Sequence, residues 1–211
     1  MDIFFMPVGM LGANCYILSE PEAPECFMID PGGEAHIIIN RLDSLGIKPK
    51  YILITHGHPD HIEAIDELRE AWPEARVMIH EGDMKTLTSI DRRFPTPQWA
   101  KEGAGGVDFY REGEEIRCGG MSLRPVFTPG HSPGGVCLIN DEENCAFTGD
   151  TLFNGSVGRS DFPGGNYPDL EASIRQKLYR LPRDMKVFPG HGQDTTIGRE
   201  MESNPFIREG S

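Results

Sequence analysis

Hydrophobic and polar positions along the chain form two successive series of strand-like and helix-like segments. The first series predicts strands at residues 3–6, 15–18, 26–29 and 51–54, and helices at 34–45 and 62–72. The second series predicts strands around residue 116 and at 123–127, 135–139, 145–147 and 186–188, and a helix at 169–181. Each sheet needs helices to cover one face, so the pattern predicts two stacked sheets with helices outside, a four-layer αββα sandwich of the α/β class.

The length of 211 residues favours one domain over residues 1–211, because it allows a full hydrophobic core without requiring a second one. Residues 91–106 are rich in Pro, Gly and Ala and predict a long irregular segment. Such a segment either covers a site or is a surface excursion with two packed aromatic residues, Phe94 and Trp99. We expect disorder only in the tail after Arg208.

Charge and cysteine content narrow the class of partner. There are 20 Lys and Arg against 33 Asp and Glu, and the net charge of −13 argues against a nucleic-acid partner. No apolar run is long enough for a membrane span, and the N-terminus lacks the basic region of a signal peptide. The five cysteines are odd in number and form no CxxC motif, which favours reduced thiols. We therefore predict a cytoplasmic protein with no membrane partner.

The densest chemical signal is THGHPDH at residues 55–61, directly after a predicted strand. His56 and His58 continue the alternation of that strand, so both side chains can point the same way and hold one metal ion. Asp60 and His61 follow the turn and can face a second ion. A polar loop without function is a poor account of three histidines and one aspartate within six residues.

Three further candidate ligands each follow a predicted strand and stand next to a glycine: His131, Asp150 and His191. Glycine permits tight turns and a close approach of the backbone to a metal ion. Taken singly, each of these turns is more often structural, but together with the first motif they indicate a metal centre. The other two histidines, His36 and His80, are assigned no function.

The HxHxDH motif and the three later loops resemble the metallo-β-lactamase superfamily over essentially the whole chain. The resemblance implies two metal sites, the first held by His56, His58 and His131 and the second by Asp60, His61 and His191, with Asp150 bridging both. It also implies that Asp30 supports the metal-binding loop without being a ligand.

Within the superfamily the chain most resembles glyoxalase II (hydroxyacylglutathione hydrolase), in its short bacterial form. The resemblance rests on residues 13–16 (ANCY), 128–135 (TPGHSPGG), 147–152 (FTGDTL), 157–165 (VGRSDFPGG) and 204–206 (NPF). Full-length glyoxalase II continues into a helical domain that holds glutathione, and we expect this chain to lack that domain because it stops at Ser211.

The expected reaction is hydrolysis of a small, anionic thioester, such as an S-acyl-glutathione, by a hydroxide that bridges two divalent metal ions. Zinc is the expected metal, and iron and manganese are alternatives because His and Asp ligands accept all three. Asp60 and Asp150 are candidate catalytic residues through their place at the metal ions. Arg159 and Ser160 are candidate substrate contacts, and the alternative for Arg159 is an internal ion pair with Asp161 or Asp60.

Several rival functions share this fold. The first is a persulfide dioxygenase with one Fe(II) on His56, His131 and Asp150, whose segment Gly-Arg-Thr-Asp is similar to residues 158–161. Ser160 in place of Thr, and the Pro-Gly-Gly that follows, favour the hydrolase. Zinc β-lactamases commonly carry Cys where Asp150 stands, which argues against a β-lactamase. A non-catalytic binding protein would typically have lost metal ligands, whereas all seven candidate positions are filled here.

Overall fold

The computed structural model describes residues 1–87, 97–101 and 107–208. The first sheet has the order β1-β2-β3-β4-β5-β6. Its strands are β1 (Asp2–Val8), β2 (Ala13–Ser19), β3 (Glu25–Ile29), β4 (Lys48–Leu53), β5 (Arg76–Ile79) and β6 (Val107–Phe109). Strands β1 to β3 are antiparallel, and β3 to β6 are parallel.

The second sheet has the order β14-β13-β10-β9-β8-β7. Its strands are β7 (Ile116–Cys118), β8 (Met121–Phe127), β9 (Val136–Asn140), β10 (Cys145–Gly149), β13 (Lys186–Pro189) and β14 (Thr195–Thr196). Strand β9 is antiparallel to both β8 and β10, and β13 is parallel to β10. Strands β8, β10 and β13 therefore run in one direction, and their C-terminal ends lie along one edge. A small hairpin, β11 (Leu152–Phe153) and β12 (Ser156–Val157), follows β10.

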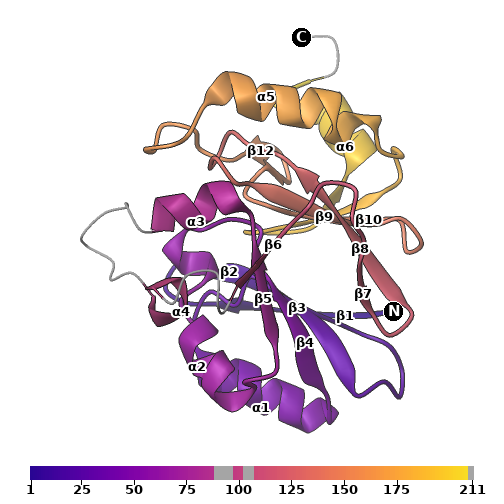
Figure 1. Cartoon of the computed structure of the whole chain (residues 1–211). Coiled ribbons are helices and arrows are strands. Elements are labelled where there is room, and N and C mark those ends of the chain that lie inside the picture. The colour runs from indigo at the N-terminus through magenta and orange to yellow at the C-terminus, as the bar shows by residue number, and fades with distance from the viewer. Residues whose placement is uncertain (88–96, 102–106, 209–211) are drawn as a thin grey trace.

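Helices cover the two outer faces of the paired sheets (Figure 1). On the side of the first sheet lie α1 (Ala35–Leu45), α2 (Ile65–Ala71), α3 (Glu81–Leu87) and α4 (Gln98–Lys101). On the side of the second sheet lie α5 (Tyr167–Gln176) and α6 (Ile197–Ser203). The described residues also contain two short 3₁₀ turns, η1 (Pro59–His61) and η3 (Leu178–Arg180).

Side chains of β2 alternate between two separate cores, which shows how the layers arise. Cys15 and Ile17 pack into the core beneath α1 and α2. Tyr16 and Leu18 point the other way, into the core between the two sheets. The ring centres of Tyr16 and Phe147 lie 5.1 Å apart there. A third core lies between the second sheet and α5 with α6. The four-layer αββα sandwich predicted from the sequence is confirmed.

The predicted elements differ from the observed ones mainly at their ends. The helix predicted at 62–72 is shorter in the structure, where it forms α2, because residues 62–64 after η1 form a turn and the helix begins at Ile65. The helix predicted at 169–181 begins earlier, where the Asn166 side chain accepts a hydrogen bond from the backbone of Asp169, and ends at Gln176. Within the segment predicted to be irregular, Gln98–Lys101 is helical, and that part of the prediction is wrong.

Trp99 is fully buried in the core beneath α2, and Asp66 accepts hydrogen bonds from the backbone of Gln98 and Trp99. The buried Trp99 side chain therefore fits the second of the two alternatives given for residues 91–106, a surface excursion with packed aromatic residues. The remainder of the segment, at 91–96 and 102–106, and the expected disordered tail at 209–211 lie outside the described residues. All five cysteines are buried and free. Among the helices of the described ranges, none has the length and apolar character to cross a membrane.

Candidate metal centre

The seven candidate ligands converge because their loops leave neighbouring strand ends. His56 to His61 follow β4 in the first sheet, and His131, Asp150 and His191 follow the three strands of the second sheet that run in one direction. A hydrogen bond of 2.8 Å from the backbone N–H of Val136 to the carbonyl of Thr55 joins the two sheets directly beside the first motif. Residues up to 135 positions apart thus share one site.

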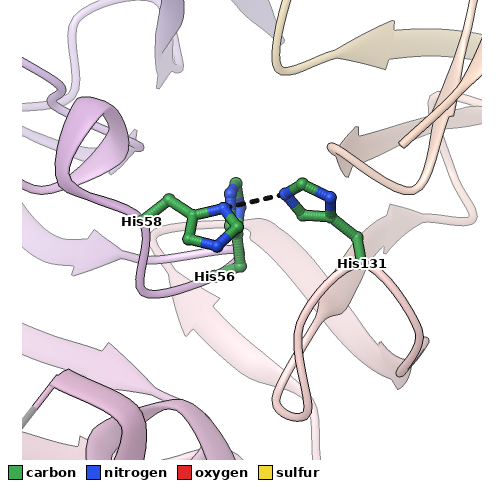
Figure 2. Close-up of side chains that lie close together, drawn as sticks. All are labelled: His56, His58 and His131. Carbon is green, nitrogen blue, oxygen red and sulfur yellow. Dashed lines mark hydrogen bonds between the residues drawn. The ribbon is translucent and has the colours of Figure 1, made fainter. Parts of the chain in front are cut away.

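Three histidines form the first cluster, named here the three-histidine group: His56, His58 and His131. Their candidate ligand nitrogens all lie within 4.8 Å of one another. Nδ1 of His58 is 2.8 Å from Nε2 of His131, and Figure 2 shows these two rings approaching from separate loops with His56 beside them. His56 and His131 are buried, whereas His58 is partly exposed, so the group is open on the His58 side.

A second cluster, named here the mixed group, consists of Asp60, His61 and His191. Oδ2 of Asp60 lies 3.2 Å from Nε2 of His191 and 3.7 Å from Nε2 of His61. His61 is fully buried, while the side chains of Asp60 and His191 keep 20% and 28% of their surface exposed. This group therefore also has a face that a small molecule can reach.

Asp150 lies between the two groups. Its Oδ1 is 3.5 Å from Nε2 of His61, and its Oδ2 is 3.6 Å from Nε2 of His131 and 3.7 Å from Nε2 of His191. The neighbouring turn approaches so closely that a Cβ at Gly190 would lie 2.3 Å from Oδ1 of Asp150. Only glycine fits there.

Hydrogen bonds orient three of the imidazole rings so that Nε2 faces the centre. The carbonyl of Arg159 accepts from Nδ1 of His131 at 2.6 Å, and Oδ2 of Asp30 lies 3.0 Å from Nδ1 of His61. The Thr55 hydroxyl donates its single proton to Asp30, so Nδ1 of His56, 3.1 Å away, is the donor toward Thr55. With its proton on Nδ1, the neutral form of each ring presents the lone pair of Nε2, which is how metal-binding histidines are commonly fixed.

Buried atoms without a partner mark the same place. Among the described residues, five buried side-chain polar atoms make no hydrogen bond, and three of them belong to this site: Nε2 of His56, Nε2 of His61 and Oδ1 of Asp150. The other two, on Trp99 and Tyr110, belong to residues outside the candidate ligand set. Buried polar atoms are nearly always paired, so three orphaned ligand atoms facing one centre fit a metal ion that would satisfy them. Asp30 also lies close to His56 and His61, but its carboxylate is taken up by Thr55 and by Nδ1 of His61. It orients the ligands rather than joining them.

Comparison with known proteins agrees with this geometry. The family model described as the metallo-beta-lactamase superfamily matches residues 8–191. The chain belongs to the metallo-beta-lactamase superfamily.

Similar proteins differ in their described functions. The hydroxyacylglutathione hydrolase GloC of Haemophilus influenzae is 37% identical, with 100% of each chain covered. A structure described as the B3 metallo-beta-lactamase BLEG-1 has a TM-score of 0.87 and 34% identity, covering 98% of this chain and 99% of that one. A di-iron-bound form of the protein TTHA1623 has a TM-score of 0.84 and 35% identity, covering 97% of this chain and 100% of that one. The chain is thus similar over nearly its full length to proteins described as a hydroxyacylglutathione hydrolase, a B3 metallo-beta-lactamase and a di-iron-bound protein.

Protonation in the three-histidine group suits metal binding. Burial, reinforced by the nearby His131, lowers the pKa of His58 to about 4. Burial likewise lowers the pKa of His56 well below its usual value, and His61 adds to this effect. Both rings are therefore neutral at pH 7, which is the form that binds a metal ion.

The mixed group holds opposite charges in contact. Burial by itself would lower the pKa of His61, but the charges of Asp150 and Asp30 outweigh it and raise the pKa to about 9. Burial by itself would raise the pKa of Asp60, but hydrogen bonding to His191 and the charge of His61 lower it to about 2. Without metal, His61 therefore carries a proton at pH 7 that a metal ion would have to displace.

Two supporting residues were missed by sequence reasoning. Asp83 in α3 accepts hydrogen bonds from Gly57, Ser132 and Gly134, and burial raises its pKa. The amide of Asn14 donates to the carbonyls that flank His191 on either side. The ANCY segment signalled Asn14 only as a point of resemblance, and Asp83 carried no local signal.

One of the two predicted substrate contacts, Arg159, lies near His58 through the ring of Phe162. Arg159 is exposed, forms a bidentate ion pair with Asp161 at 2.9 Å, and places its guanidinium 4.1 Å from the ring centre of Phe162. The ring of Phe162 in turn lies 5.9 Å from that of His58. The internal ion pair with Asp161 is therefore present, and it holds Arg159 close to the three-histidine group. Ser160 is partly exposed beside it.

Proposed function

We propose that this chain is a dinuclear metal-dependent hydrolase that cleaves small thioesters, S-acyl-glutathiones among them. The observation that carries the proposal is the set of orphaned ligand atoms on His56, His61 and Asp150 at the meeting point of the two groups. The three-histidine group would hold one ion, the mixed group would hold the other, and Asp150, within 3.7 Å of a histidine in each group, would bridge them.

When bound, two divalent cations would generate a water-derived nucleophile at neutral pH and polarise the substrate carbonyl. The protein's part is to fix these ligands and to supply compensating charge. Asp60 stays ionised down to a pH of about 2 and so remains a fixed negative charge rather than a proton donor. Arg159 lies at the open side next to His58 and would attract an anionic substrate to a protein of net charge −13.

The thioester class is supported by full-length similarity to a hydroxyacylglutathione hydrolase. Zinc remains the metal we propose first, and the di-iron-bound relative supports iron as the alternative, since imidazole and carboxylate ligands accept both. The proposed substrate is a small molecule, and from the net charge of −13 and the lack of a long apolar run in the sequence we expect neither nucleic acid nor membrane as a partner.

The test combines metal content with activity. The chain is purified without added metal, its metals are counted per chain, and hydrolysis of S-lactoylglutathione is followed by thiol release. We expect about two metal ions and thioester cleavage. Asp150→Asn should reduce both, because it removes the carboxylate shared by the groups, whereas Asp141→Asn, an exposed aspartate paired with Arg124, should change neither.

One rival function has a geometric basis in the same site. His56, His131 and Asp150 also lie together, with His131 Nε2 3.6 Å from Asp150 Oδ2, and could hold the single Fe(II) of a persulfide dioxygenase. Oxygen uptake with glutathione persulfide, together with one iron per chain, would replace the hydrolase proposal. Cleavage of nitrocefin without cleavage of thioesters would point to a β-lactamase instead.

A further inference from the structure

One buried carboxylate connects the two loops that carry the three-histidine group. Asp83, in the first turn of α3, has no exposed surface. Its Oδ2 accepts hydrogen bonds of 2.7 Å from the backbone N–H of Gly57 and from the hydroxyl of Ser132. Its Oδ1 accepts a bond of 2.5 Å from the N–H of Gly134. Gly57 belongs to the loop after β4, and Ser132 and Gly134 belong to the loop after β8.

Two of the three donors adjoin candidate ligands in the chain. Gly57 stands between His56 and His58, and Ser132 follows His131. A change in the position of the carboxylate would therefore change the distance between His58 and His131, whose facing nitrogens are 2.8 Å apart (Figure 2).

Glycine at two of the donor positions allows this close packing. A Cβ at Gly134 would lie 2.5 Å from the backbone nitrogen of Asp83 and 2.8 Å from its Cγ. A Cβ at Gly57 would lie 3.3 Å from the Cβ of Asp83. Both loops thus contact Asp83 without intervening atoms, and little slack remains for either loop to shift independently.

We propose that Asp83 is a positioning residue that sets the separation of His58 and His131 and thereby controls metal affinity at the three-histidine group. This inference rests on the proposed function, because it assumes that the group holds a metal ion. Asp83 itself is not a ligand, since both of its oxygens are taken up by the two loops. Outer partners of this kind typically contribute about 10- to 100-fold to metal affinity.

Asparagine is the most informative substitution for Asp83, because it keeps the size and shape of the side chain and changes only its hydrogen-bonding capacity. An ionised carboxylate only accepts hydrogen bonds, whereas an amide has one accepting oxygen and one donating nitrogen. In Asp83→Asn the amide nitrogen must face either Gly134 N–H or Gly57 N–H, so one donor meets another donor. That loop is expected to move away.

Glu200 provides a matched control. It is also a fully buried carboxylate that accepts three hydrogen bonds, from the N–H of Gly155 at 2.9 Å, the hydroxyl of Thr195 at 2.6 Å and the amide of Asn204 at 2.8 Å. None of these three donors adjoins a residue of the three-histidine group in the chain. Glu200→Gln should therefore leave metal binding at that group unchanged, because its amide nitrogen can donate to the Thr195 hydroxyl while its oxygen accepts from Gly155 and Asn204.

The experiment measures Co²⁺ binding to the full chain by visible absorption with a competing chelator. To separate the two sites, Asp83→Asn is combined with His191→Ala, which leaves the three-histidine group as the working site, and with His131→Ala, which leaves the mixed group. We expect about 10- to 100-fold weaker Co²⁺ binding with an altered absorption band in the first background, and less than about twofold change in the second. Ser132→Ala should weaken the same site to a smaller degree.

Three outcomes would overturn the inference: wild-type affinity in Asp83→Asn, an equal loss in both backgrounds, or an equal loss in Glu200→Gln. If Asp83→Asn does not fold, Ser132→Ala decides the matter, and wild-type affinity in that variant would overturn the inference. A wild-type chain that binds no Co²⁺, Zn²⁺ or iron would instead contradict the proposed function, and the inference would fall with it.

Discussion

Nδ1 of His61 lies 3.0 Å from Oδ2 of Asp30, so the residue that follows β3 orients a ligand candidate 31 positions later in the chain. Asp30 has a φ of 50°, a left-handed conformation that asparagine also tolerates. Asp30→Asn should therefore preserve the backbone and change only the carboxylate. We expect metal affinity at the mixed group to fall about 10- to 100-fold, measured by chelator competition. Asp43→Asn on the exposed side of α1 is the control, and equal affinities in the two variants would contradict the orienting role.

Metal binding should depend on pH differently at the two groups. His61 has a pKa of about 9 without metal, so a metal ion at the mixed group must displace a proton below that pH. His58 has a pKa of about 4 and is already neutral. Between pH 6 and pH 9 the apparent affinity of the mixed group should rise about tenfold per unit, one proton being released per ion, while that of the three-histidine group changes little.

Zinc titrations at pH 6, 7 and 8 in the His131→Ala and His191→Ala backgrounds measure these two slopes separately. Two equal slopes would show that His61 does not carry the displaced proton.

Asn14 should control the position of His191. Its amide nitrogen lies 3.0 Å from the carbonyls of both Pro189 and Gly192. Asn14→Asp replaces this donor with an acceptor and leaves the Gly192 carbonyl without its amide partner, so the free energy of unfolding of the metal-free chain should fall by about 1–3 kcal/mol. Metal affinity at the mixed group should fall with it, by about 10- to 100-fold.

Tyr16→Phe serves as the comparison for Asn14→Asp. The Tyr16 hydroxyl donates to the same Pro189 carbonyl at 2.6 Å, but that carbonyl keeps its bond from Asn14 when the hydroxyl is removed. Denaturant unfolding and metal titration should therefore show a smaller loss in Tyr16→Phe. A larger loss in that variant would show that Tyr16, rather than Asn14, mainly holds the turn that carries His191.

Arg159 offers two separable contributions. Its carbonyl orients His131, whereas its guanidinium is exposed next to Phe162. Arg159→Ala keeps the carbonyl, so metal content should not change. KM for an anionic thioester should rise about two- to fivefold, the effect of one solvent-exposed ion pair, and KM for a neutral thioester should stay the same. Equal increases in KM for both substrates would show that the charge of the guanidinium does not contribute to substrate binding.

Local patterns were sufficient for the sandwich and for the candidate ligands. The helical spacing of apolar residues predicted the helix at 34–45, and α1 ends at Leu45, where the C-cap Gly46 has a φ of 68°. The HxHxDH motif signalled the centre because its residues are adjacent in the chain. Asp83 could not be predicted in this way, since in sequence it is an ordinary acidic residue in the first turn of a seven-residue helix.

The distance along the chain explains what was missed. The partners of Asp83 stand 26, 49 and 51 positions away, and no periodicity of two or 3.6 residues records such contacts. The role of Arg159 in orienting His131 was hidden for another reason: it belongs to a backbone carbonyl, so the identity of the side chain carries no information about it.

Each candidate metal group takes ligands from both sheets, with His131 and His191 on one side and His56, His58, Asp60 and His61 on the other. A bound ion would therefore act as a cross-link between the two halves of the sandwich. Its binding free energy would add to that of the apolar core between the sheets, so the resistance of the chain to unfolding would depend on the free metal concentration around it.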